Sequence, residues 1–303
     1  MKKDFLTLDN FSREEIFDLI KAASDLKEKR KNNVPHQPLK GKSLGMIFNK
    51  HSTRTRISFA VGMFELGGQS LFLSSDQLQL KRGETIADSA RVLSRYLHGI
   101  LVRTYGFEEA QELARHASIP VINGLTDLNH PVQVLCDMFT IHEKLGRIEG
   151  VKVAYVGDGN NVAYSLITGA SLLGMNLSIA TPPEYKLQVP ESFEKRGNIT
   201  FTEDPFEAVK DADIIYTDVW VSMGHEEKTD EKKKILRPYQ INSKLVDAAR
   251  KDVLIMHCLP AHREDEITSE VLDGKHSIVF DQAENRLHVQ KAILESLLSP
   301  HQQ

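Results

Sequence analysis

The segment Ser52-Thr53-Arg54-Thr55-Arg56 brings three hydroxyl groups and two guanidinium groups together within five residues. An apolar run at 44–48 precedes it and a helical run at 57–66 follows it, so the order predicts strand, short loop and helix. Ser52 is a preferred N-cap residue, and the amides of Thr53, Arg54 and Thr55 are expected to be unpaired donors. Such a helix start, with Arg54 and Arg56 countering negative charge, predicts a phosphate or carboxylate ligand. An exposed, capped helix with surface arginines is the alternative, which the rest of the chain must decide.

Polar and charged residues also follow the other predicted strands. They are Asp76-Gln77-Leu78-Gln79, Arg103, His130-Pro131-Val132-Gln133, Gly157-Asp158-Gly159-Asn160-Asn161, residues 218–224, and His257-Cys258-Leu259-Pro260. In open parallel sheets, ligands bind beyond the carboxyl ends of the strands, so these segments are expected to share one edge. Strand-end loops without a function usually carry Gly, Asp and Ser. Arginine, histidine and cysteine at these positions therefore indicate a binding or catalytic site.

The elements expected to position these side chains alternate between strand and helix. Strands are predicted at residues 44–48, 70–73, 100–103, 119–122, 151–156, 177–180, 199–202, 214–217, 253–257 and 278–280. Helices are predicted after the capping box of Ser12 and Glu15, and at residues 53–66, 84–97, 108–117, 131–145, 162–173, 206–210, 243–250, 269–272 and 283–298. Short β-rich runs that alternate with helices predict an α/β fold with doubly wound parallel sheets.

The length of 303 residues favours two domains. Pro131 opens a long helix that we interpret as a bridge between them. We expect residues 1–133 to form the first domain and residues 134–282 the second, joined by interdomain helices. The C-terminal helix, 283–303, is expected to return to the first domain. The charge run at 225–234 is either a solvated helix start or a mobile lid.

Composition excludes several classes of function. The net charge of -4 comes without a strongly basic face, so no nucleic-acid partner is expected. Cys136 and Cys258 are too few for a disulfide framework or a closed zinc site, which fits a reducing cytosol. Neither a secretion signal nor an apolar run of membrane-spanning length is present, so a cytoplasmic protein without membrane contact is predicted.

The strand-end segments resemble, in order and spacing, the motifs of the aspartate/ornithine transcarbamoylase family. Ser52 to Arg56 looks like the family's phosphate-binding motif, and His130 to Gln133 resembles its next motif. Residues 218–224 and 257–260 are similar to the amino-acid loop and the cysteine motif of the ornithine enzymes, and Gln282-Ala283-Glu284-Asn285-Arg286 matches their C-terminal motif. The resemblance covers nearly the whole chain. The one small departure is Lys50-His51, where the family's proline is expected at the second position.

The resemblance implies a transferase that moves the carbamoyl group of carbamoyl phosphate to the δ-amine of L-ornithine, giving L-citrulline and phosphate. This reaction belongs to arginine biosynthesis or, in reverse, to arginine degradation. A homotrimer, or a larger assembly of trimers, is the implied oligomer. No cofactor is implied, and the scattered histidines lack the spacing of metal ligands.

By the same resemblance, the residues expected to bind carbamoyl phosphate are Ser52, Thr53, Arg54, Thr55, Gln79, Arg103, His130, Gln133, Cys258, Leu259 and Arg286. Thr55, Arg103 and His130 would contact the carbonyl oxygen, which gains negative charge in the transition state and is best stabilised by preorganised donors. Gln79 would act at this site across a subunit boundary or within one chain.

The resemblance assigns ornithine to Asn161, Asp218, Ser222 and Met223. Asp218 would hold the side-chain amine, which must lose a proton, and Cys258 would share the handling of that proton. Arg103, His130, Asp218 and Cys258 are therefore the expected catalytic residues. Asn161, Ser222 and Met223 would bind the α-amino and α-carboxylate groups.

Two other classes of protein compete with this interpretation. Val156-Gly157-Asp158-Gly159 suggests a nicotinamide-dependent oxidoreductase, but Val162 stands where the dinucleotide fingerprint requires a third small residue. A non-catalytic amino-acid-binding protein would have no need of Arg103 and His130 beside a phosphate site. Within the family, aspartate and acetylornithine enzymes are the alternatives. Asp218 argues against an acidic second substrate, which it would repel.

Overall fold

The structure, a computed structural model, describes residues 3–74, 83–194, 198–221 and 229–299. The chain forms two compact units, Met1–Phe139 with Asn285–Gln303 (unit 1) and Thr140–Glu284 (unit 2). The chain passes between the units inside two helices, α5 (Pro131–Leu145) and α12 (Val279–Leu298). The division of functional domains at residues 133 and 282 stays a prediction.

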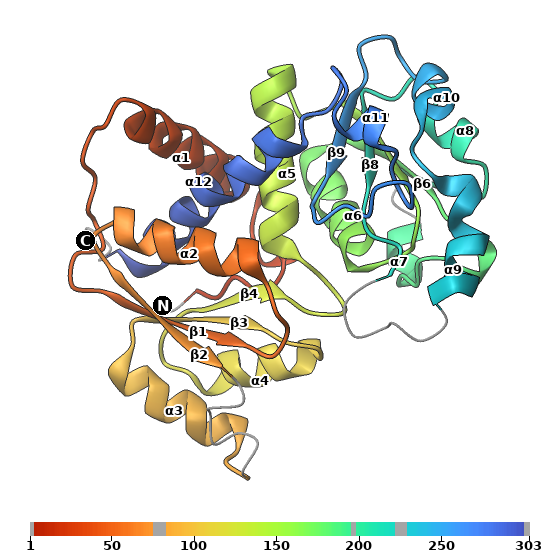
Figure 1. The fold of residues 1–303 in the computed structure, drawn as a ribbon. Coiled ribbons are helices and arrows are strands. Elements are labelled where there is room, and N and C mark those ends of the chain that lie inside the picture. Colours follow the sequence, from red (N-terminus) through yellow and green to blue (C-terminus); the bar gives the residue numbers. More distant parts are fainter. Residues whose placement is uncertain (1–2, 75–82, 195–197, 222–228, 300–303) are drawn as a thin grey trace. The chain divides into compact units, whose positions relative to one another are not determined.

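Unit 1 is built on a four-stranded parallel sheet with the order β2-β1-β3-β4. Its strands are β1 (Ser43–Phe48), β2 (Gln69–Ser74), β3 (Gly99–Arg103) and β4 (Val121–Leu125). Between them run α2 (Thr53–Glu65), α3 (Ile86–Tyr96) and α4 (Phe107–His116). Figure 1 shows α3 and α4 on one face of this sheet and α2 on the other. Ile47, Ile100 and Val102 pack against α3 and α4 in one apolar core.

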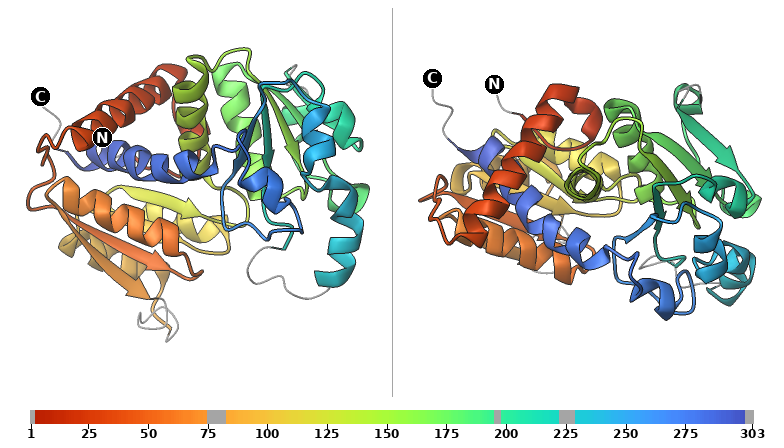
Figure 2. Two further views of the ribbon diagram at one scale, coloured as in Figure 1. Left: turned by 45° about the horizontal axis from the view of Figure 1, so that its top comes forward. Right: turned by 90° about the horizontal axis from the view of Figure 1, so that it is seen from above.

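Helix α1 (Arg13–Lys31) begins where the sequence predicts. Ser12 accepts a hydrogen bond from the amide of Glu15, whose carboxylate accepts one from the amide of Ser12, so the capping box is confirmed. Helix α12 lies beside α1 in unit 1 (Figure 2), where Lys27 Nζ donates to Asn285 Oδ1 at 2.8 Å. A short 3-10 helix, Leu8–Asn10, precedes α1.

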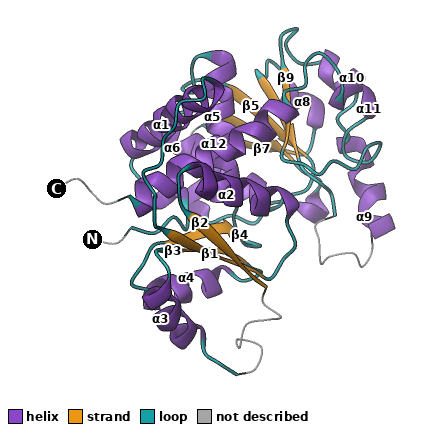
Figure 3. Cartoon of the chain, turned by 60° about the vertical axis from the view of Figure 1, so that its left-hand side comes forward, coloured by secondary structure: helices purple, strands orange, loops and turns teal. Residues whose placement is uncertain are grey.

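Unit 2 is built on a five-stranded parallel sheet with the order β7-β6-β5-β8-β9. Its strands are β5 (Lys152–Val156), β6 (Asn176–Ala180), β7 (Ile199–Thr202), β8 (Ile214–Thr217) and β9 (Leu254–His257). Its helices are α6 (Asn161–Leu173), α7 (Glu191–Glu194), α8 (Pro205–Val209), α9 (Thr229–Leu236), α10 (Ser243–Asp247) and α11 (Ser269–Leu272), with 3-10 turns at Pro183–Tyr185 and Arg237–Tyr239. Within each unit, helices flank the strands on both faces (Figure 3), so the predicted α/β fold with two parallel-sheet domains is confirmed.

One predicted strand is wrong. Residues 278–280 were expected to be a strand, but Val279 begins α12, and only an isolated bridge joins Ser277 to Ile255 of β9. Phe280 is 67% exposed, whereas a strand covered on both faces would bury it. The helix thus begins four residues before the predicted start at residue 283, and Asp281 lies in its first turn, where a carboxylate is favoured by the helix dipole.

The charge run at 225–234 has two parts. Its end lies in α9, which begins at Thr229, so a helix does start there. Residues 225–228 lie outside the described residues, and the lid interpretation stays a prediction. No described helix is long and apolar enough to cross a membrane.

Candidate active site

Each sheet has a point at which consecutive connections leave in opposite directions. In unit 1 this point lies between β1 and β3, whose last residues, Phe48 and Arg103, are paired in register. In unit 2 it lies between β5 and β8. Ligands bind beyond the carboxyl ends of the strands at such switch points. The predicted loops after β1, β3, β5 and β8 therefore stand where each fold is suited to bind a ligand.

The phosphate-type loop of unit 1 opens α2 as expected. Ser52 is the N-cap residue, and its Oγ accepts a hydrogen bond from the amide of Thr55 at 3.2 Å. The amide of Thr55, expected to be unpaired, is therefore already bonded to Ser52. The first-turn amides of Thr53 and Arg54 point along the same helix axis, so the positive end of the helix dipole still faces the loop.

Arg286 of α12 connects two other predicted residues in unit 1. Its Nη2 donates to Thr55 Oγ1 at 2.7 Å, and its Nη1 donates to Gln133 Oε1. Gln133 in turn donates from Nε2 to Asp137 Oδ1 at 2.9 Å. Thr55, Gln133 and Arg286 are 1%, 0% and 4% exposed, so this is a buried network. It brings together residues that are up to 231 positions apart in the sequence.

His130 lies in the same buried, positively charged region. Burial and the neighbouring charges of Arg286 and Arg103 hold the pKa of His130 well below its usual range. His130 is 5% exposed and Arg103 is 7% exposed. The imidazole is therefore neutral at physiological pH and can donate one N–H, while the two guanidinium groups stay charged.

A second network in unit 1 joins the segments that follow β1, β3 and β4. Lys50, 7% exposed, pairs with Asp127 after β4 and lies 4.4 Å from the centre of the Tyr105 ring. Asn49 Nδ2 donates to Thr104 Oγ1 at 2.8 Å, which ties the residues after β1 to those after β3. Lys50 thus anchors the loop directly before His51, the position at which the family's proline is expected.

Asp218 is the centre of the polar cluster in unit 2. It is 6% exposed, and its Oδ1 accepts a hydrogen bond from Cys258 Sγ at 2.8 Å. Its Oδ2 accepts one from Asn160 Nδ2 at 2.7 Å. The structure therefore brings together Asp218 and Cys258, as predicted, at the ends of the neighbouring strands β8 and β9.

Asn160 was missed by the sequence reasoning, which selected Asn161. Asn160 is the N-cap residue of α6, and its Oδ1 accepts from the amides of Val162 and Ala163 while its Nδ2 faces Asp218. Asn161 is the first residue of α6, partly exposed. The N-cap preference for asparagine was the signal that could have distinguished the two positions.

The loop after β5 is shaped unlike a dinucleotide site. A side chain at Gly159 would meet the backbone of Tyr185 and Leu187 at 2.5 Å, so this glycine serves internal packing. The amides at the start of α6 are bonded to Asn160, as described above, and the carboxylate of Asp158 pairs with Lys232 of α9 at 2.8 Å. A pyrophosphate would meet a carboxylate and occupied amides here, which argues against the oxidoreductase alternative.

The Tyr155 hydroxyl is buried and hydrogen-bonded to this loop. Burial, with the charges of Asp218 and Asp158, raises the pKa of Tyr155 well above its usual range. The hydroxyl therefore stays protonated and donates to the carbonyl oxygen of Asp158 at 2.8 Å. It is a support of the loop rather than a proton acceptor.

Three side chains of unit 2 could be taken for metal ligands. Asp218, His257 and Cys258 bring one ligand atom each within 4.8 Å of one another, a grouping that sequence spacing does not reveal. Both ring nitrogens of His257 are engaged, however: Nδ1 accepts from the amide of Leu259 at 2.8 Å and Nε2 faces Glu266 Oε1 at 3.0 Å. His257 could bind a metal only by losing one of these bonds, so the group does not fit a metal site.

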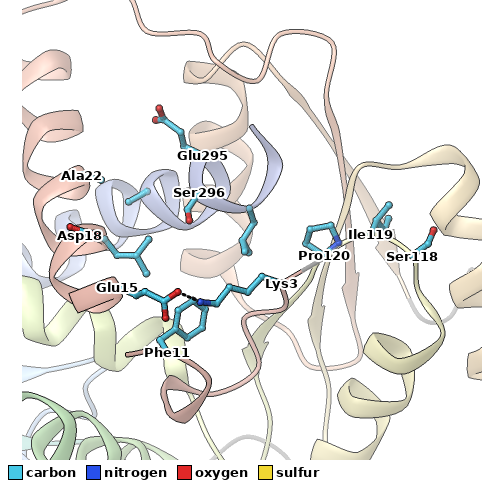
Figure 4. A pocket seen from close by; sticks show the side chains of 13 residues that line it. Lys3, Phe11, Glu15, Asp18, Ala22, Ser118, Ile119, Pro120, Glu295 and Ser296 are labelled. Carbon is cyan, nitrogen blue, oxygen red and sulfur yellow. Dashed lines mark hydrogen bonds and ion pairs between the residues drawn. The ribbon is translucent and has the colours of Figure 1, made fainter. Parts of the chain in front are cut away.

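A cavity of about 710 Å³ in unit 1 lies away from these loops. Figure 4 shows it between α1, α12 and the segment before β4, with Lys3 paired to Glu15 beside Phe11. None of the predicted site residues lines it. Its position supports no role in the predicted reaction.

Three predicted site residues, Gln79, Ser222 and Met223, lie outside the described residues. Leu259 follows Cys258 in a left-handed backbone conformation with a φ of 57°. Arg54 is partly exposed in the first turn of α2. The roles of these residues in binding stay predictions.

Comparison with known proteins matches two stretches of the chain to one family. Residues 3–143 match the family described as "Aspartate/ornithine carbamoyltransferase, carbamoyl-P binding domain". Residues 149–297 match the family described as "Aspartate/ornithine carbamoyltransferase, Asp/Orn binding domain".

Individual relatives are similar over nearly their full length. An ornithine carbamoyltransferase of Thermococcus kodakarensis is 52% identical over 299 residues, which cover 96% of this chain and 95% of that protein. One of Syntrophus aciditrophicus is 52% identical over 305 residues, covering 98% and 100%. The solved structure of ornithine carbamoyltransferase from Pyrococcus furiosus has a TM-score of 0.94 at 50% identity, covering 99% of this chain and 98% of that one. The chain belongs to the aspartate/ornithine carbamoyltransferase family.

Proposed function

We propose that this protein is an ornithine carbamoyltransferase, a transferase that converts carbamoyl phosphate and L-ornithine to L-citrulline and phosphate. The observation that carries the choice of ornithine is the buried carboxylate of Asp218 at the switch point of unit 2. A carboxylate attracts the ammonium or amine end of ornithine and repels the acidic side chain of aspartate. The names of the similar proteins support the same assignment.

Carbamoyl phosphate is a dianion, and unit 1 offers it a positive environment. The start of α2 with Ser52, Thr53 and Arg54 would bind the phosphate group, because a helix N-terminus and a guanidinium both favour oxyanions. Arg286 would add charge while it keeps Thr55 and Gln133 in place through its two hydrogen bonds. Gln133 would then bind the carbamoyl amide.

The carbonyl oxygen gains negative charge when the amine attacks the carbonyl carbon. Thr55, Arg103 and His130 would stabilise this oxygen as preorganised donors. Because its pKa is held low, His130 would act as a neutral N–H donor throughout and would not become a competing acid. The carbon–oxygen bond to phosphate then breaks, phosphate leaves, and the nitrogen loses a proton.

Unit 2 would hold the nucleophile. Asp218 would accept a hydrogen bond from the δ-amine, with its own carboxylate fixed by Asn160 and Cys258. Cys258 and Leu259 would also contact carbamoyl phosphate, and Cys258 would take part in moving the proton. Asn161, Ser222 and Met223 would bind the α-amino and α-carboxylate groups, which fixes the reach of the side chain.

A homotrimer, or a larger assembly of trimers, is the proposed oligomer. Strand β2 is an edge strand and exposes Leu71 and Phe72 by 41% and 38%, while Ile57 and Phe64 of α2 are 56% and 78% exposed. Apolar side chains on an edge strand and its neighbouring helix are typical of a surface covered by another chain. We also propose a reducing cytoplasmic compartment, since Cys136 and Cys258 are not joined in a disulfide, and the anabolic direction named for the Pyrococcus furiosus relative.

Product identification tests the proposed reaction. Purified protein incubated with carbamoyl phosphate and L-ornithine is expected to yield citrulline and equimolar phosphate, measured by mass spectrometry and a phosphate assay. Arg103→Ala is the matched negative control. Phosphate release without citrulline, or citrulline at the rate of the protein-free mixture, would reject the assignment.

A further inference from the structure

His257 and Glu266 form a buried chain of hydrogen bonds behind the Cys258-Leu259 segment. Both residues are 0% exposed, and Glu266 Oε1 lies 3.0 Å from His257 Nε2. The same oxygen accepts the amide of His262 at 2.6 Å. On the other side of the ring, His257 Nδ1 accepts the amide of Leu259 at 2.8 Å. A carboxylate is thus linked through an imidazole to the backbone that follows the cysteine.

The direction of these bonds fixes the tautomer of His257. Because Nδ1 accepts from a backbone amide, the ring proton lies on Nε2 and is donated to Glu266. Glu266 Oε2 has no hydrogen-bond partner among the described residues. Burying a carboxylate is costly unless it is hydrogen-bonded or paired, and here the hydrogen bonds are those to Oε1. Both hydrogen bonds of this carboxylate are made by Oε1, one with the His257 ring and one with the amide of His262.

The backbone of Leu259 supplies an independent reason for such a clamp. Its φ of 57° lies in the left-handed region, which is unfavourable for a residue with a side chain and persists only where surrounding contacts hold it. The bond from its amide to His257 is such a contact. Cys258, between these two residues, is thereby aimed at Asp218, which its Sγ contacts at 2.8 Å.

We propose that His257 and Glu266 are positioning residues, which fix the Cys258-Leu259 backbone so that the Cys258 thiol meets the Asp218 carboxylate. The expected effect of these residues on kcat rests on the proposed function. Their expected effect on the reactivity of the Cys258 thiol does not, because it concerns only the contact between Cys258 and Asp218.

Two pairs of variants separate this role from one in stability alone. His257→Asn retains an acceptor that can bond the amide two residues ahead, whereas His257→Ala removes it. Glu266→Gln keeps an oxygen for the two donors, whereas Glu266→Leu removes it. His276→Asn is the matched control, since the His276 ring contacts the carbonyl oxygen of Val253 at 2.8 Å and has no bond to the cysteine segment.

Activity is the first measurement. A misplacement of about 1 Å can cost about 100-fold in rate, so His257→Ala and Glu266→Leu are expected to lower kcat by about 10- to 100-fold. The KM for ornithine should change by less than about threefold, because the α-amino and α-carboxylate contacts are untouched. His257→Asn and Glu266→Gln should recover most of the lost kcat, and His276→Asn should retain it.

The second measurement is alkylation of Cys258 by iodoacetamide, with Cys258→Ser as the blank. The thiolate is the reactive form, and the bond to Asp218 holds the sulfur as a thiol. In His257→Ala and Glu266→Leu, the Cys258 thiol is expected to lose its bond to Asp218, and its alkylation rate should rise by at least about fivefold. In His257→Asn and Glu266→Gln, the alkylation rate should return toward the wild-type value.

The outcomes are distinguishable. Folded Ala and Leu variants with wild-type kcat and alkylation rates would overturn the proposal, as would a Glu266→Gln variant no better than Glu266→Leu. If the Ala variant does not fold, the comparison between the two Glu266 variants still decides. If the wild-type protein makes no citrulline, the proposed function fails, and the alkylation rates alone decide the positioning role.

Discussion

Cys258 Sγ and Asp218 Oδ1 lie 2.8 Å apart, although 40 residues separate them in the sequence. The two residues follow β9 and β8, neighbouring strands whose carboxyl ends meet at one edge of the unit 2 sheet. The same carboxylate is held from its other side by Asn160, which follows β5. Three adjacent strands therefore fix one acceptor, and the proposed reaction needs such an acceptor for its amine.

Asp218 is expected to contribute most to holding that amine. Asp218→Asn removes the charge, and a charge-assisted hydrogen bond contributes about 1.5–3 kcal/mol, so kcat/KM for ornithine should fall by at least about tenfold. Cys258→Ser keeps a hydrogen-bond donor to Asp218, so its kcat/KM for ornithine should fall less than that of Cys258→Ala. Steady-state citrulline formation measures all three variants. An Asp218→Asn enzyme that matched the wild-type kcat/KM would remove Asp218 from the amine site.

Arg54 is expected to bind the phosphate group. Arg54→Ala should weaken binding of carbamoyl phosphate by at least about tenfold, since it removes a charge-assisted contact of about 1.5–3 kcal/mol. Arg56→Ala is the matched control, because its guanidinium lies 3.8 Å from the centre of the Phe72 ring and should affect binding less. Isothermal titration calorimetry measures both. Equal affinity in Arg54→Ala and wild type would show that the motif is a capped surface helix.

His130 should make the folded protein less stable in mild acid. Unfolded histidine takes up a proton below a pH of about 6.5, whereas burial and the charges of Arg286 and Arg103 keep the folded pKa well below that value. Stability should therefore fall as the pH drops below about 6.5, by up to about 1.4 kcal/mol per pH unit from this group. His130→Gln should remove that contribution.

Urea unfolding at pH 7.5, 6.5 and 5.5 measures the effect. The difference in urea midpoint between His130→Gln and the wild type should shift in favour of His130→Gln as the pH falls. A constant offset between His130→Gln and wild type across this range would contradict the low folded pKa.

The signals that predicted the fold are local ones. Ser12 and Ser52 cap helices because a serine before a helical run satisfies first-turn amides, and both caps are present. The error at residues 278–280 came from a β-rich triplet in which Val279 already begins α12, and the single bridge to β9 is made by the preceding residue, Ser277. Short apolar runs do not distinguish strand from helix by periodicity.

The sequence predicts which strand ends come together more readily than it predicts the individual contacts between side chains there. Asp218 and Cys258 could be assigned to one edge because parallel strands align their carboxyl ends. The contact between Asn160 and Asp218 depends on how the N-cap side chain of α6 turns back over the helix start, and the role of Asn161 in binding stays a prediction. His257 and Glu266, which are hydrogen-bonded, stand nine positions apart with irregular chain between them, and no periodicity indicates this bond.

Gln79 and Arg103 test whether the site is shared between chains. Gln79 follows a strand at the exposed edge of the unit 1 sheet, so a neighbouring subunit of a cyclic trimer is its expected place of action. Gln79→Ala and Arg103→Ala homotrimers are each expected to be inactive, and mixing them with subunit exchange should restore part of the activity. Native mass spectrometry confirms the mixed trimers. Confirmed mixtures that stay inactive would place Gln79 in the site of its own chain.

The choice of ornithine is the central claim, and a comparison of kcat/KM for a panel of amines tests it most directly. Because one end of the substrate is anchored, one side-chain length should place the nitrogen about 3–3.5 Å from the carbonyl carbon. A primary alkyl amine has a pKa of about 10.4, so kcat/KM for ornithine should also rise with pH across the neutral range. We predict that kcat/KM for ornithine is far higher than kcat/KM for lysine, putrescine, acetylornithine or aspartate. A larger kcat/KM for any of these four would contradict the assignment.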